Sequence, residues 1–92
     1  MILISNGSTT SSAARWQGGQ GTFTVVGTLG GATVTLQYLG PDGTTWVQAG
    51  SDAALTAAGG VVFTLHACKI RALVAGGTPS GLYVSAEPNT MD

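Results

Sequence analysis

Short apolar runs with a period of two recur along this chain, and turn-forming residues close each run. The runs are rich in β-branched and aromatic residues, which favour strands, and the alternation places the apolar side chains on one face. The clearest runs cover residues 22–26, 33–39, 45–48, 61–65, 70–74 and 82–85, and weaker ones surround Leu55 and cover 2–5. No apolar stripe has helical spacing. We therefore predict an all-β fold, a small antiparallel β-sandwich or jelly-roll-like barrel of about seven strands.

One hairpin is predicted in detail, at residues 38–46. Pro41 presets the φ that the first central position of a turn needs, Asp42 can bond to its own backbone, and Gly43 accepts a positive φ. The strands on either side should therefore be antiparallel neighbours. In the first of them, Val34, Leu36 and Tyr38 should face the core, with the polar residues between them facing out.

The size of the chain limits how it can be stabilised. Its 92 residues make a single domain spanning 1–92, with a marginal core. The usual supports of small scaffolds are disulfides, metals and oligomerisation. Cys68 is the only cysteine, so an internal disulfide is impossible, and one histidine with one cysteine cannot form a structural zinc site. Charged residues are 8 % of the chain, against about 25 % in a typical protein, so few charges protect its sheet edges. We expect a homo-oligomer without cofactors.

The charge and the first residues exclude other classes of partner. A formal net charge of −1 provides no electrostatic footprint for nucleic acid or an acidic membrane. The start, Met1 to Asn6, has a short apolar run and no preceding positive charge, so we expect neither a signal peptide nor a membrane span. Synthesis and assembly in a cytoplasm are the resulting expectation.

Residues 5–21 differ from the rest of the chain. This segment is small, polar and rich in glycine, serine and threonine, and Trp16 alone supplies apolar bulk. It is predicted to be an extended arm or a long loop that becomes ordered against a partner. Arg15 and Trp16 are the predicted partner-binding residues, because arginine and tryptophan are favoured anchors of protein interfaces. The tail, residues 88–92, is predicted to be frayed.

The chain offers little for catalysis or metal binding, and we predict no catalytic, cofactor-binding or metal-binding residues. His66 and Cys68 would share a face of a strand, yet no third group is evident to orient a Cys–His pair. The glycines at 18–21 and 76–77 precede no helix, so turn chemistry explains them better than phosphate binding. Trp46 lies in a strong strand, where it is either a core or half-core residue or a binding aromatic.

Three stretches resemble a group of small virion accessory proteins of tailed bacteriophages: Gly18–Val25, Gly31–Trp46 and Ile70–Tyr83. The resemblance covers residues 18–86 and is most like head decoration, or cement, proteins. It implies a non-enzymatic structural protein on the exterior of the capsid, assembled in the bacterial host cytoplasm. Its implied partner is the phage major capsid protein, whose neighbouring subunits it would clamp, and trimers are the implied oligomer. The alternative is a glycan- or receptor-binding β module on a phage tail or fibre, with a small hydrolase using His66 and Cys68 as a third class.

Overall fold

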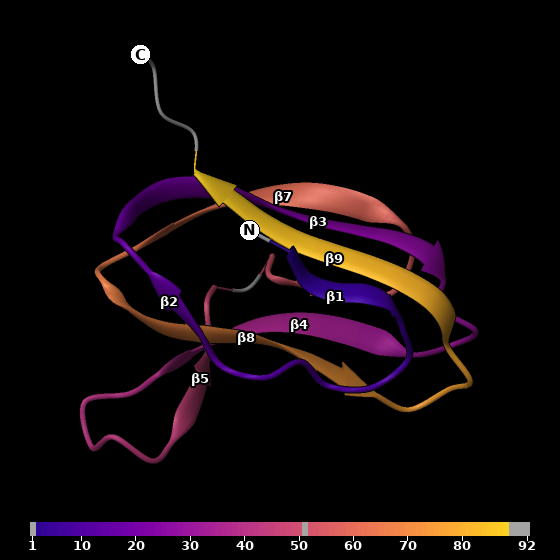
Figure 1. The fold of residues 1–92 in the computed structure, drawn as a ribbon, viewed down its shortest axis with the longest axis horizontal. Helices are drawn as coiled ribbons and strands as arrows, with labels where there is room; N and C mark the ends of the chain where they lie inside the picture. The colour runs from indigo at the N-terminus through magenta and orange to yellow at the C-terminus, as the bar shows by residue number, and fades with distance from the viewer. Residues whose placement is uncertain (1, 51, 89–92) are drawn as a thin grey trace.

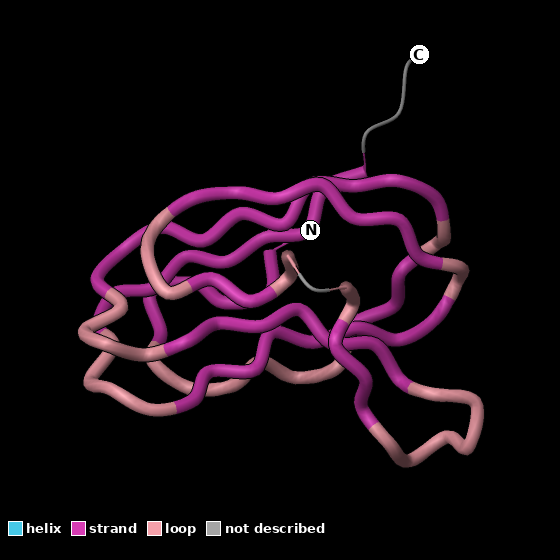
Figure 2. Tube along the Cα trace, turned by 180° about the vertical axis from the view of Figure 1, so that it is seen from behind, coloured by secondary structure: helices cyan, strands magenta, loops and turns pink. Residues whose placement is uncertain are grey.

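The structure, a computed structural model, describes residues 2–50 and 52–88. Within these residues the chain forms two antiparallel sheets that pack face to face, with loops at their ends (Figures 1 and 2). The first sheet has the order β1-β9-β3-β7, and the second has the order β2-β8-β4-β5, with β6 also paired to β4. The strands are β1 (Ile2–Gly7), β2 (Ala14–Trp16), β3 (Gly19–Thr28), β4 (Thr33–Leu39), β5 (Trp46–Gln48), β6 (Ala54–Leu55), β7 (Gly59–Leu65), β8 (Cys68–Ala75) and β9 (Ser80–Pro88). The predicted all-β fold is confirmed, and its form is a small sandwich.

The core lies between the sheets and follows the period of two. The central strands of both sheets send alternate side chains inward, among them Phe23 and Val25 of β3 and Leu82 and Val84 of β9. In β4, Val34 and Leu36 are buried as predicted, and Tyr38 is partly buried. Thr35 was predicted to face out, but it is buried, and its cross-strand neighbours are Ala54 and Leu73.

The predicted hairpin joins β4 to β5, with Leu39 opposite Trp46. Its loop projects from the body of the sandwich (Figure 2). Gly43 has a φ of 76° and donates its N–H to the carbonyl of Gly40 at 3.1 Å. The carboxylate of Asp42 accepts the N–H groups of Thr44 at 3.0 Å and Thr45 at 2.9 Å, and the hydroxyl of Thr45. These bonds hold the pKa of Asp42 at about 2, below its usual 3.8, chiefly through the Thr45 hydroxyl.

The prediction that residues 5–21 form one extended arm or long loop is wrong in part, because only residues 8–13 and 17–18 lie outside strands. The segment includes the end of β1, all of β2 and the start of β3. The stretch before β2 is also attached to β8: Ser11 exchanges hydrogen bonds with the backbone of Ala72, and the hydroxyl of Thr10 bonds to the backbone of Val74. The side-chain hydroxyls thus make hydrogen bonds to the backbone of β8 that the backbone of a neighbouring strand would otherwise make. A polar segment can therefore lie along the edge of the sheet without being a regular strand.

Trp16 is a core residue and cannot be an exposed anchor, which corrects that part of the partner-binding prediction. Its side chain is 0 % exposed, and its ring lies 4.9 Å from that of Phe63. The β2 register places it opposite Cys68 on the inner face of the sandwich. Gly21 makes room for it, since a Cβ at that position would lie 2.6 Å from Cη2 of the indole. Of the predicted tail, Pro88 ends β9, and residues 89–92 lie outside the described residues.

Candidate functional site

The outer face of the second sheet gathers the positive charge of the molecule. Arg15 of β2 lies directly opposite Lys69 of β8, and Arg71 follows two residues later on the same strand. Because side chains alternate along a strand, Lys69 and Arg71 face outward on either side of the buried Ile70. These three residues are all the lysines and arginines of the chain. We call them the cationic face.

Arg71 is held in place by contacts from β4 and β5. Its Nε donates to Oε1 of Gln37 at 2.8 Å, and its guanidinium carbon lies 4.5 Å from the ring centroid of Trp46. Gln37 is the cross-strand partner of Arg71 and also of Gln48 on β5. Trp46 is half-buried beneath the guanidinium, and it is not among the side chains that form the core or pack against it.

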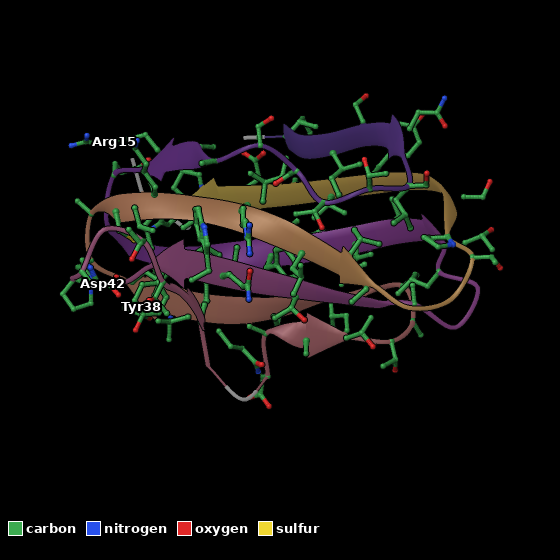
Figure 3. The ribbon with its side chains drawn as sticks, turned by 90° about the horizontal axis from the view of Figure 1, so that it is seen from below. Arg15, Tyr38 and Asp42 are labelled. Carbon is green, nitrogen blue, oxygen red and sulfur yellow. The ribbon has the colours of Figure 1, made fainter. Side chains whose placement is uncertain are left out.

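The cationic face lies towards the end of the sandwich that carries the β4–β5 hairpin. Figure 3 shows Arg15, Tyr38 and Asp42 at this end. At the same end, the ring of Tyr38 makes an edge-to-face contact with the ring of His66, and the ring centroids are 5.6 Å apart. Glu87 is on the opposite side of the molecule, on the outer face of β9. Glu87 is therefore separated from the cationic face across the thickness of the sandwich, whereas Asp42 lies in the β4–β5 loop at the same end as that face.

The structure places His66 and Cys68 in different surroundings. His66 lies exposed between β7 and β8, whereas Cys68 opens β8 and is partly buried. Burial raises the pKa of the Cys68 thiol, and an activated nucleophile requires the opposite shift. Among residues 2–50 and 52–88, no three His, Cys, Asp or Glu side chains are grouped in a way that could hold a metal ion. The described surface contains no pocket, so the candidate site is an open face.

Of the residues predicted from the sequence, Arg15 alone belongs to this surface. Lys69, Arg71 and Trp46 were not predicted as partners of Arg15. The spacing Lys69-Ile70-Arg71 indicates two cations on one side of a strand. No sequence signal places Arg15 beside them, because that requires β2 to pair with β8.

Comparisons with known proteins identify no relative of this chain. No family model matches the chain, and no curated protein and no solved structure shows a significant match to it. The likeness to phage virion proteins therefore stays a prediction. None of the described residues belongs to a helix long and apolar enough to cross a membrane.

Proposed function

We propose that this chain is a non-enzymatic structural protein of a phage virion, a capsid decoration protein on the outer shell. It binds the major capsid protein through the cationic face, and it clamps neighbouring capsid subunits there. The observation that carries the proposal is the collection of every lysine and arginine of a sparsely charged chain on one face of a rigid sheet. The particle is assembled in the cytoplasm of the bacterial host.

The arrangement of charge supports docking onto an acidic protein surface. Like charges directly opposite one another in a sheet are destabilising, so the Arg15–Lys69 pair weakens the free protein slightly. An acidic partner would convert that repulsion into attraction. Glu87, on the outer face of the other sheet, would face away from such a surface and would not repel it at contact. Arg71 and Trp46 supply the planar, pre-organised groups that are enriched in protein interfaces.

Purified particles test the proposal directly. Mass spectrometry and immunogold labelling should find the protein on the head. Binding of the purified protein to particles that lack it should weaken as salt rises. Arg15→Gln and Lys69→Gln should each weaken binding by about 1 kcal/mol, within the range for charges at the rim of an interface.

The matched control removes a charge from the opposite face. Glu87→Gln should leave head binding unchanged, because Glu87 lies on the outer face of the other sheet. A protein located on the tail would contradict the proposal. Binding that neither salt nor the Arg15 and Lys69 variants affect would contradict the role of the cationic face.

The second candidate is a glycan- or receptor-binding module on a tail or fibre. It is favoured by the planar polar groups beside Trp46, namely Gln37, Gln48 and Arg71, which offer hydrogen-bonding groups next to an aromatic ring. A glycan array separates the two functions. Signals that Trp46→Ala abolishes, from a protein found on the tail, would support the module and exclude the decoration protein.

A further inference from the structure

The edges of the two sheets differ in how well they are protected against pairing with another strand. An exposed edge presents free backbone N–H and C=O groups, and proteins block it with charges, bulges, proline or short strands. Edge β1 has register irregularities after Ile2 and after Ser5, and Asn6 has a φ of 53°. Edge β2 is three residues long and contains Arg15. On the far side of β4, β5 and β6 have only three and two residues.

The edge formed by β7 has none of these protections. It pairs with β3 without a bulge over its whole length of seven residues, from Gly59 to Leu65. It contains no charge and no proline, and the nearest charged residues along the chain are Asp52 and Lys69. No described strand pairs with its outer side, and Figure 1 shows it at the rim of its sheet. At its midpoint, Val62 is 59 % exposed.

We propose that β7 pairs antiparallel with β7 of a second copy of this chain, so that the two four-stranded sheets become one continuous sheet. An uncharged strand suits its own copy, because no charge is brought against a like charge or buried without a partner. Two identical strands also match in length. The pairing occupies the β7 edge of both copies, so it closes as a two-fold dimer and does not extend into a fibre.

The register of this pairing follows from the side chains of β7. Phe63 and Leu65 point into the core, whereas Val62 and Thr64 point out. Residues directly opposite one another in an antiparallel pair lie on the same face, so an inward residue must meet an inward residue. Full overlap of the strands places Val62 opposite its own copy and Val61 opposite Phe63. The register that overlaps the two strands completely is therefore also one in which inward side chains meet inward side chains.

This dimer differs from the trimer that the phage resemblance implies. It is also independent of the proposed docking, because β7 and the cationic face belong to different sheets. Substitutions at Val62 therefore test the dimer, and substitutions at Arg15 and Lys69 test the docking.

Sedimentation of the purified protein at micromolar concentration tests the proposal. The wild-type chain should sediment at twice its 9.1 kDa mass. Val62→Lys should raise the dimer dissociation constant about tenfold or more, since two ammonium groups would then meet at the two-fold axis. Val62→Thr should keep the dimer, because threonine is also β-branched. Circular dichroism should show that both variants remain folded.

Val26→Lys is the matched control. Val26 is an exposed valine on the same outer face, but it lies on the interior strand β3 beyond the last β7 pair. It should leave the dimer intact. A wild-type monomer, a trimer, or dissociation by Val26→Lys to the same extent as by Val62→Lys would each overturn the edge pairing.

Cross-linking provides a second readout. Facing residues of an antiparallel pair have Cα atoms about 4.5 or 5.5 Å apart, and a disulfide can span both distances. In a Cys68→Ser background, Val62→Cys should therefore form a disulfide-linked dimer under mild oxidation. Val26→Cys should remain unlinked, and the reverse result would refute the register.

Discussion

Replacing Trp16 by alanine tests whether the segment before β3 belongs to the core. The indole is 0 % exposed and packs on Phe63, and its removal leaves a cavity between the sheets. Tryptophan-to-alanine changes in cores cost about 3–5 kcal/mol. One feature of the site lowers this cost, because the buried Nε1–H of Trp16 has no hydrogen-bond partner among the described residues. An unsatisfied buried donor costs about 1–3 kcal/mol, so we expect a loss near the lower limit, about 3 kcal/mol.

That loss is a large part of the free energy of unfolding, which is about 5–15 kcal/mol for a domain. It corresponds to a fall in Tm of roughly 12–24 °C for a chain of this size. Trp16→Phe should cost about 1 kcal/mol or less, because it keeps an aromatic ring against Phe63 and removes the unsatisfied N–H.

Urea denaturation at 25 °C, followed by far-ultraviolet circular dichroism at one fixed protein concentration, measures both variants. The fixed concentration matters because self-association would itself add stability. A Trp16→Ala protein within about 1 kcal/mol of wild type, with weakened binding to particles, would refute the reasoning. Trp16 would then be the partner anchor that its sequence context suggests.

Three further outcomes are expected. The pKa of Asp42 in the folded protein is about 2, below its usual 3.8. The stabilisation that its carboxylate gives the hairpin should therefore be complete above about pH 4 and lost as pH falls towards 2. An NMR titration of the Asp42 carboxyl carbon with a midpoint near 3.8 would contradict its hydrogen bonds to Thr44 and Thr45. Gly21→Ala should cost about 1–3 kcal/mol in urea denaturation, since the new Cβ would lie 2.6 Å from Cη2 of Trp16 and 2.8 Å from the Glu87 carbonyl oxygen. Burial raises the pKa of Cys68, so iodoacetamide should modify the folded protein more slowly at neutral pH than the urea-unfolded chain, and faster reaction when folded would show an activated thiol.

The main strands could be predicted from the sequence because the alternation of side chains is a local property. Val34 and Leu36 point inward wherever β4 lies in the fold, since successive residues of a strand face opposite ways. The β4–β5 hairpin is equally local. Pro41, Asp42 and Gly43 specify its turn within a few residues, and the carboxylate bonds of Asp42 are made inside that loop.

Strand β2 could not be predicted in this way. Ala14, Arg15 and Trp16 are too few to show a period, and the preceding residues are polar. They form a strand because the edge of β8 accepts them, with the hydroxyls of Thr10 and Ser11 continuing the contact. Polar composition indicates a free arm only where no such edge is available.

The two surfaces that support our proposals depend on which strands become neighbours. The sequence determined that Lys69 and Arg71 share a face and that β7 carries no charge. Only the tertiary structure brought Arg15 beside Lys69, and only the strand order left β7 at an edge. The physical reason is that the direction of a side chain is set by its own backbone, whereas strand neighbours are chosen by contacts between residues distant in the chain, through the packing of the whole core.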